Sequence, residues 1–92
     1  MEENKNIVKA DFGKIEVKDI EGNAQYIDVR KAIGNQLYMQ GADYVECHLG
    51  ERIWNSEGLL ELDDKEVAAV VKFTEGYPYL SRTAIRKAVG KE

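Results

Sequence analysis

Residues 15–29 read IEVKDIEGNAQYIDV, and this stretch decides the fold of the chain. Ile15 and Val17 alternate with charged residues before a polar Glu-Gly-Asn segment, and Ile27 and Val29 alternate with polar residues after it. A strand places every second residue on the same face, and glycine with asparagine is typical of a turn. The stretch therefore predicts an antiparallel β-hairpin.

The register of this hairpin follows from the rule that paired residues share a face of the sheet. A three-residue loop at 21–23 satisfies the rule, whereas a two-residue loop would pair apolar with polar positions. We therefore expect Val17 to lie opposite Ile27, with the two outer apolar residues also facing each other. We expect Asn23 to adopt the left-handed conformation that closes such loops.

The rest of the chain shows a helical period, with apolar residues three and four positions apart. Four helices are expected: from near Asp28 to Gly41, through Val45, Leu49 and Ile53 to Asn55, from Asp63 to Gly76, and from about Tyr79 to Val89. Asp63 with Glu66 forms a capping-box pattern, and Asp28 is the expected cap of the first helix. Gly34 disfavours a helix by about 1 kcal/mol relative to alanine, so we expect close packing there. Gly50 weakens the prediction of the second helix.

These elements predict an α+β fold. An N-terminal antiparallel β-hairpin is expected to pack against about four short α-helices, of which the last two form a helical hairpin. Gly58–Leu62 is either a third strand or an extended connector, and 7–12 is expected to form an extended edge. One small domain accounts for residues 1–92, since two hydrophobic cores would each be too small, and residues 1–5 are expected to be frayed.

The composition narrows the possible environments and partners. The net charge of −4 disfavours a general phosphate-binding surface, but acidic residues cluster between Asp43 and Glu66 and cations cluster after Ser81. The single cysteine cannot form an internal disulfide, and no apolar stretch is long enough for export or for a bilayer. We therefore expect a cytoplasmic protein that does not enter a membrane.

Cys47 and His48 are the only cysteine and histidine in the chain, and they are adjacent. On a helix their side chains point about 100° apart, so they form neither a chelating pair nor a nucleophile with its base. A buried or half-buried thiol is the simpler interpretation of Cys47. The phosphate-binding glycine motifs and the calcium loop are also missing. The sequence therefore predicts no enzyme, no metal, no cofactor and no evident small-molecule substrate.

The last predicted helix carries cations on the side opposite its apolar residues. Arg82, Thr83, Arg86 and Lys87 fall on this side, after a helix and a tight turn, which is the outline of a helix-turn-helix DNA reader. The helix lacks the asparagine or glutamine that often reads bases, and cations near a helix C-terminus are favoured by the dipole. A solvated face is therefore the preferred interpretation, and nucleic acid binding is the alternative.

Three aromatic residues are candidates for binding a partner. Trp54 lies on the side of its helix opposite the apolar residues, so it either packs against the connector at 59–60 or anchors a partner. Tyr77 and Tyr79 flank Pro78 in the turn before the last helix, where rings pack over helix ends or contact a partner. We take Trp54, Tyr77 and Tyr79 as the candidate partner-binding residues.

Two runs carry a resemblance to a known group of proteins. IEVKDIEGNAQYIDVRKAIGNQLYMQ at 15–40 and IWNSEGLLELDDKEVAAVV at 53–71 resemble small uncharacterised proteins encoded in bacterial prophages and related mobile elements. The resemblance implies a bacterial accessory protein that acts through contacts with other proteins, as in phage assembly, and it assigns no functional residue. We therefore expect a noncatalytic module that binds a protein partner or itself. The alternative is a small DNA-binding regulator using Arg82, Arg86 and Lys87.

Overall fold

The structure, a computed structural model, describes residues 7–91, and the segment 1–5 predicted to be frayed lies outside these residues. The described chain forms an α+β fold, as predicted. Its elements, in chain order, are β1 (Val8–Ala10), β2 (Ile15–Lys18), β3 (Ala24–Ile27), α1 (Arg30–Gln40), α2 (Tyr44–Trp54), β4 (Leu60–Leu62), α3 (Asp64–Phe73) and α4 (Tyr79–Ala88).

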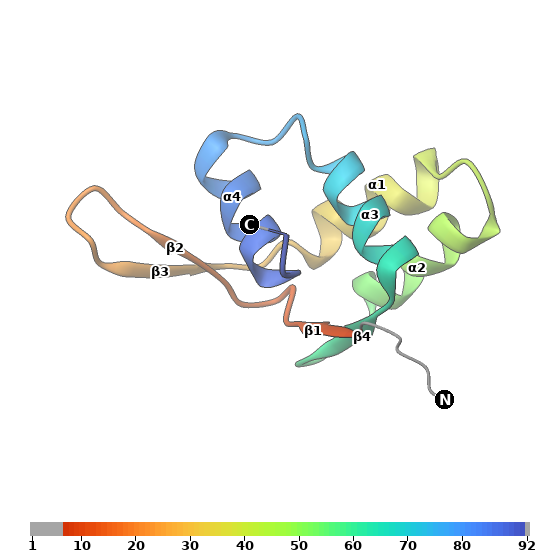
Figure 1. The fold of residues 1–92 in the computed structure, drawn as a ribbon, viewed down its shortest axis with the longest axis horizontal. Helices are drawn as coiled ribbons and strands as arrows, with labels where there is room; N and C mark the ends of the chain where they lie inside the picture. Colours follow the sequence, from red (N-terminus) through yellow and green to blue (C-terminus); the bar gives the residue numbers. More distant parts are fainter. Residues whose placement is uncertain (1–6, 92) are drawn as a thin grey trace.

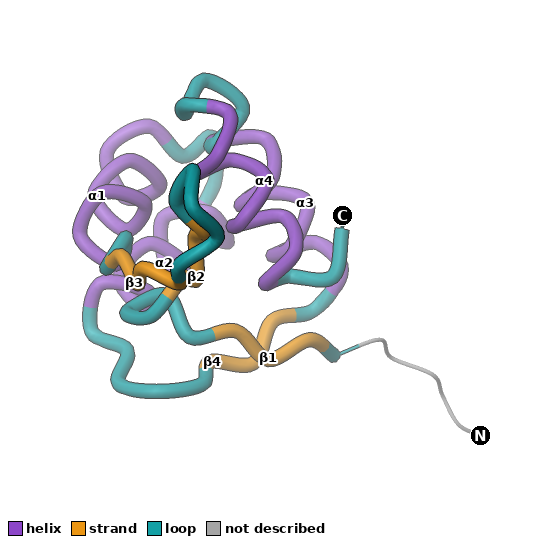
Figure 2. Tube along the Cα trace, turned by 90° about the vertical axis from the view of Figure 1, so that its left-hand side faces the viewer, coloured by secondary structure: helices purple, strands orange, loops and turns teal. Residues whose placement is uncertain are grey.

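The strands form two separate antiparallel pairs. β2 pairs with β3 in the expected hairpin, while β1 pairs with β4, with Lys9 opposite Glu61. The segment that the sequence left open between strand and connector is therefore a strand at 60–62, and its partner is the N-terminal edge rather than the hairpin. Figure 1 shows the hairpin tip projecting away from the helices, and Figures 1 and 2 both show the β1–β4 pair lying apart from the hairpin strands.

The hairpin register differs from the prediction by two residues. Ile15 lies opposite Ile27, and Val17 lies opposite Gln25 instead of Ile27. A shift of two keeps each residue on its predicted face, because side chains alternate with a period of two. The apolar face was therefore predicted correctly, although the pairing was wrong.

The turn explains this shift. The Asp19 carboxylate accepts hydrogen bonds from the N–H groups of Glu21 (3.0 Å) and Asn23 (2.9 Å), which closes the turn one residue earlier than predicted. The bond from Asn23 holds the pKa of Asp19 below its ordinary value. Gly22, with φ of 86°, takes the left-handed conformation that was predicted for Asn23. Glycine adopts this conformation without a Cβ clash, so it is the better residue for this position.

The helix starts show one confirmed cap and one that differs. Asp63 accepts from the Glu66 N–H and Glu66 accepts from the Asp63 N–H, both at 2.9 Å, so the predicted capping box at the start of α3 is confirmed. At α1 the N-cap residue is Val29, which makes no side-chain cap bond. Asp28 instead accepts from the backbone and the guanidinium of Arg30 just before the first turn. It therefore orders the entry to the helix without capping it.

One hydrophobic core joins the helices to both sheets. Its largest fully buried apolar residues are Phe12, Ile15, Ile33, Leu37, Leu49, Ile53, Leu62, Val67, Val70, Ile85 and Val89. Some residues on the apolar faces of the helices lie outside it, among them Val45, which is 47% exposed, and Leu80, which is 55% exposed. The first turns of α2 and α4 therefore leave apolar surface uncovered.

Candidate functional site

Two glycines bring α1 and α2 into backbone contact. A Cβ added to Gly34 would lie 2.8 Å from the Gly50 carbonyl oxygen, and a Cβ added to Gly50 would lie 2.6 Å from the Gly34 carbonyl oxygen. Ordinary side chains would hold the two helices further apart. The close packing predicted at Gly34 is therefore confirmed. Gly50, which weakened the prediction of the second helix, is the residue of α2 that Gly34 contacts.

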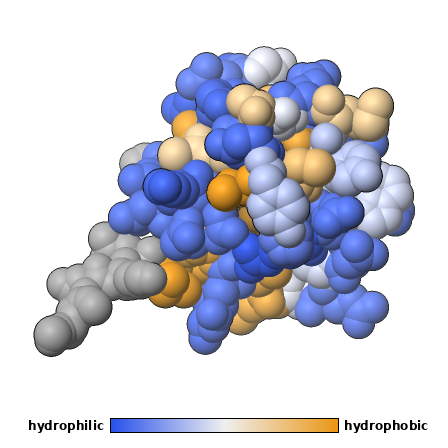
Figure 3. Space-filling model, turned by 90° about the vertical axis from the view of Figure 1, so that its right-hand side faces the viewer, coloured by the Kyte–Doolittle hydropathy of each residue, from blue (hydrophilic) through white to orange (hydrophobic). Residues whose placement is uncertain are grey.

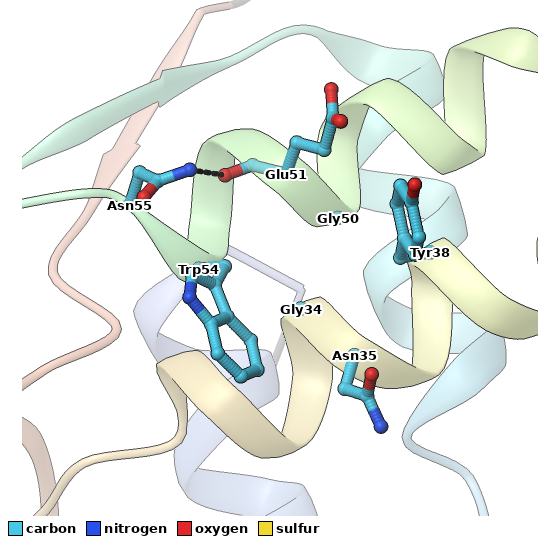
Figure 4. A pocket seen from close by; sticks show the side chains of 7 residues that line it. All are labelled: Gly34, Asn35, Tyr38, Gly50, Glu51, Trp54 and Asn55. Carbon is cyan, nitrogen blue, oxygen red and sulfur yellow. Dashed lines mark hydrogen bonds between the residues drawn. The ribbon is translucent and has the colours of Figure 1, made fainter.

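A shallow cavity opens above this glycine contact, and we name it the α1–α2 groove. Its volume is about 260 Å³, and it is lined by Gly34, Asn35, Tyr38, Gly50, Glu51, Trp54 and Asn55. Figure 4 shows Trp54 and Tyr38 on either side of the two glycines. The floor of the groove is helix backbone, because glycine offers no side chain to cover it.

Trp54 and Tyr38 keep much of their surface in solvent, with exposed fractions of 40% and 49%. One face of the Trp54 ring is occupied by a cation, since Lys31 Nζ lies 4.2 Å from the ring centroid. Asn55 donates from Nδ2 to the Glu51 carbonyl oxygen at 2.9 Å, which closes the C-terminus of α2 beside the groove. The Trp54 ring lies beside α1 and is partly exposed, and its role as a partner anchor stays a prediction.

Sequence reasoning singled out Trp54 but missed Tyr38. The signal was the spacing of Gly34 and Tyr38, which are four residues apart and so share a helix face. Because Gly34 was predicted to pack closely against another element, the Tyr38 ring on the same helix face could have been expected to lie at the edge of that contact.

The two tyrosines of the α3–α4 turn lie outside the α1–α2 groove and differ from each other. Tyr77 packs against the core, and its hydroxyl lies 3.2 Å from Gln36 Oε1, so it ties the turn to α1. Burial raises the pKa of the Tyr77 phenol above its ordinary value. Tyr79 is exposed, with the Arg82 guanidinium 5.7 Å from its ring centroid. Tyr77 is held in place by the fold, whereas Tyr79 keeps most of its surface in solvent.

The cations of α4 do not gather on a single surface. Arg86 lies in a cavity of about 410 Å³ with Lys72 and Val71 of α3, and its Nε is buried without a hydrogen-bond partner among the described residues. Lys87 lines a different cavity, which faces β2. Arg82 donates from Nη1 to the Glu75 carbonyl oxygen at 3.2 Å. The face expected to enter a DNA groove is therefore divided between two sides of the helix.

Cys47 and His48 do not come together as a reactive pair. Cys47 is a free, half-buried thiol, while His48 stacks on Tyr44 with ring centroids 5.4 Å apart. His48 Nδ1 lies 3.6 Å from a Glu51 carboxylate oxygen. Over residues 7–91, no cluster of three or more histidine, cysteine, aspartate or glutamate side chains is arranged to hold a metal ion.

The face that carries the α1–α2 connection is mixed in character. Figure 3 shows it as a hydrophilic surface interrupted by small apolar patches. Exposed apolar side chains near this connection include Met39, Tyr44 and Val45. Across the described part of the chain, no helix has both the length and the apolar composition needed to cross a bilayer.

No protein-family model, curated protein or solved structure matches this chain. The resemblance to prophage-encoded proteins therefore stays a prediction.

Proposed function

We propose that this chain is a noncatalytic bacterial accessory protein that acts by binding a protein partner, and that the partner contacts the α1–α2 groove. The observation that carries the proposal is the pair of exposed rings, Trp54 and Tyr38, on either side of a floor made by Gly34 and Gly50. Tryptophan and tyrosine are the residues most enriched among the energetic anchors of protein interfaces, and such anchors lie beside pockets.

The dimensions of the groove favour a protein side chain over a small-molecule ligand. Its volume of about 260 Å³ falls below the range of roughly 300–1,000 Å³ that is typical of ligand cavities. The groove is also shallow, so it would leave most of a metabolite in water. One or two apolar side chains of a partner match it better.

The exposed rings can supply a useful part of a binding energy. An aromatic side chain buries roughly 150–250 Å² when fully covered, so at a middle value of about 200 Å² the exposed parts amount to about 80 Å² for Trp54 and about 100 Å² for Tyr38. At about 25 cal/mol per Å², covering each ring contributes about 2 kcal/mol. A loss of that size corresponds to a roughly 30-fold weaker complex.

The experiment compares Trp54→Ala with Tyr26→Ala, which removes an exposed ring from the hairpin instead. Partners captured from a bacterial host lysate by the wild-type chain are purified and tested pairwise by calorimetry. We expect Trp54→Ala to weaken the complex about 30-fold and Tyr26→Ala to leave it unchanged. Light scattering over a concentration series tests self-association in the same variants. If both variants bind every partner as the wild type does, and the wild type stays monomeric, the groove is not the interface.

A further inference from the structure

A second groove runs between the hairpin and the last helix, and we name it the β2–α4 groove. Residues 14–18 form one wall, α4 residues between Leu80 and Ala88 form the other, and residues 9–11 close one end. Its volume is about 600 Å³. It shares no lining residue with the α1–α2 groove. The two surfaces can therefore be altered independently.

The wall formed by β2 presents the edge of the strand. Side chains in a strand point alternately to opposite faces, so a cavity on one face would touch only every second residue. Here all five consecutive residues from 14 to 18 line the groove. β3 is the only strand paired with β2 among the described residues, so the other edge of β2 is without a strand partner.

The hydrogen-bond pattern identifies which backbone groups lie on this edge. The Asp19 N–H donates to the Asn23 carbonyl oxygen at 2.9 Å, which marks that pair as hydrogen-bonded. Hydrogen-bonded and non-hydrogen-bonded pairs alternate along an antiparallel ladder. The N–H and C=O groups of Glu16 and Lys18 therefore point away from β3. Within residues 7–91, no turn, loop or cap hydrogen bond from the backbone reaches them.

The groove is positively charged although the whole chain is acidic. Its lysines are Lys9, Lys14, Lys18 and Lys87, against two carboxylates, Asp11 and Glu16. The Asp11 carboxylate already accepts from the Gly13 N–H at 3.0 Å, and Lys9 is only loosely paired with Glu61 at 4.0 Å. An acidic ligand would therefore be attracted to this surface.

Apolar side chains lie between these charges. Val17 is half-buried, and Leu80 is more than half exposed above Ala84 and Ala88 on the α4 wall. A nucleic acid backbone would gain little from such a wall, and the net charge of −4 opposes it. A second copy docked by the same surface across a two-fold axis would bring lysine against lysine.

We propose that the β2–α4 groove binds an acidic, extended segment of a partner protein, which adds to β2 as a new strand. The added strand satisfies the free N–H and C=O groups of Glu16 and Lys18, its carboxylates face the lysines, and its alternate apolar residues cover Val17 and Leu80. This inference concerns a surface separate from the α1–α2 groove, so either can fail without the other.

The test uses a capped synthetic peptide of about ten residues in which glutamate alternates with valine, a length that spans an edge strand. The peptide is titrated into the full chain, which is labelled with ¹⁵N. We expect saturable shifts and slowed hydrogen exchange at the amides of Glu16 and Lys18. The amides of Ile15 and Val17, which already bond to β3, should change little. A double charge reversal at Lys14 and Lys87 should weaken binding about tenfold or more, while Lys65→Glu on α3 should not.

A matched pair of variants separates strand addition from attraction by charge alone. Lys18→Ala and Lys18→Pro both remove the charge, but only proline removes the outward N–H. We expect the proline variant to bind more weakly than the alanine variant. Equal peptide affinities of the two variants would overturn the proposal, since added strands are held by main-chain bonds. It would also be overturned if binding did not saturate at about 1 mM peptide, or if the bound peptide did not protect the Glu16 amide from exchange. Preferential binding of duplex DNA or of a second copy would overturn it as well. If the Lys18→Pro variant does not form the hairpin, the wild-type chain alone decides whether a strand is added: the peptide must slow hydrogen exchange at the Glu16 amide, and unchanged exchange there overturns the proposal.

Discussion

Replacing Gly50 by alanine should destabilise the protein, although alanine is the better helix former. The new Cβ would lie 2.6 Å from the carbonyl oxygen of Gly34 and 2.6 Å from the backbone nitrogen of Tyr38. Both of these atoms belong to the α1 backbone, so no side-chain rotation can relieve the contact. Moving from 2.6 Å to the 3.4 Å of ordinary contact requires α1 and α2 to separate by about 0.8 Å.

The size of the effect follows from two opposing terms. Overpacking a well-packed interface costs about 1–3 kcal/mol, and backbone-to-backbone contact favours the upper end. Alanine returns about 1 kcal/mol through helix propensity. The net loss is therefore about 2 kcal/mol, out of roughly 5–14 kcal/mol expected for 92 residues. For a domain of this size, that lowers the melting temperature by about 8–16 °C.

Urea and thermal unfolding, followed by circular dichroism, measure this difference. Gly76→Ala is the matched control, because a Cβ there would meet nothing within 4 Å and its φ is not in the left-handed region. The control should be neutral or slightly more stable, since alanine restricts the unfolded chain. A Gly50→Ala protein that melts at or above the wild-type temperature would show that the helices are not in backbone contact.

The remaining predictions concern a cap, two titrating groups and DNA. Asp63→Ala should lose about 1 kcal/mol of stability in urea melts, because the first turn of α3 loses its capping-box acceptor. The hydrogen bond from the Arg30 guanidinium lowers the pKa of Asp28 to about 2. The ionised Asp28 carboxylate therefore stabilises the fold fully above about pH 4, and this stabilisation is lost as the pH falls towards 2; an NMR titration of the Asp28 carboxyl carbon measures the pKa. Burial raises the pKa of the Tyr77 phenol, so the stability contributed by the neutral phenol is lost as the pH rises through the pKa of Tyr77 in the folded protein. The difference between ultraviolet titrations of the wild type and Tyr77→Phe gives the ionisation of Tyr77 alone. Because Arg86 and Lys87 open into different cavities, duplex DNA at low salt should show no saturable binding by fluorescence anisotropy; tight, salt-sensitive binding would restore the DNA-binding alternative.

Local chemistry allowed much of the fold to be predicted from the sequence. The capping box at Asp63 and the close contact at Gly34 both follow from properties of single residues or of residues near in sequence. The hairpin face was also predictable, since alternation survives a shift of two residues. The register was not, because the bonds accepted by Asp19 select the turn, and alternation alone does not reveal them.

Contacts between distant segments were the part that sequence reasoning could not supply. The pairing of β1 with β4 joins residues 50 to 54 positions apart, and neither segment is long enough to show which partner it takes. The same limit applies to the grooves. Trp54 stood out by its type, and the spacing from Gly34 pointed to Tyr38, but whether the two rings line one groove depends on how α1 crosses α2. The lysines of the β2–α4 groove come from both ends of the chain.

Both grooves arise where the chain leaves an interaction incomplete. At the α1–α2 crossing, glycines allow the backbones to touch, so positions 34 and 50 have no side chain that could cover the flanking Trp54 and Tyr38 rings. At β2, a two-stranded sheet leaves one row of backbone groups to water. The exposed parts of the rings and the unpaired strand edge do not stabilise the isolated chain, since they become favourable contacts, with a gain in free energy, only when something covers them. A partner that covers either surface would recover that free energy, and this is the physical reason for expecting the chain to act by binding.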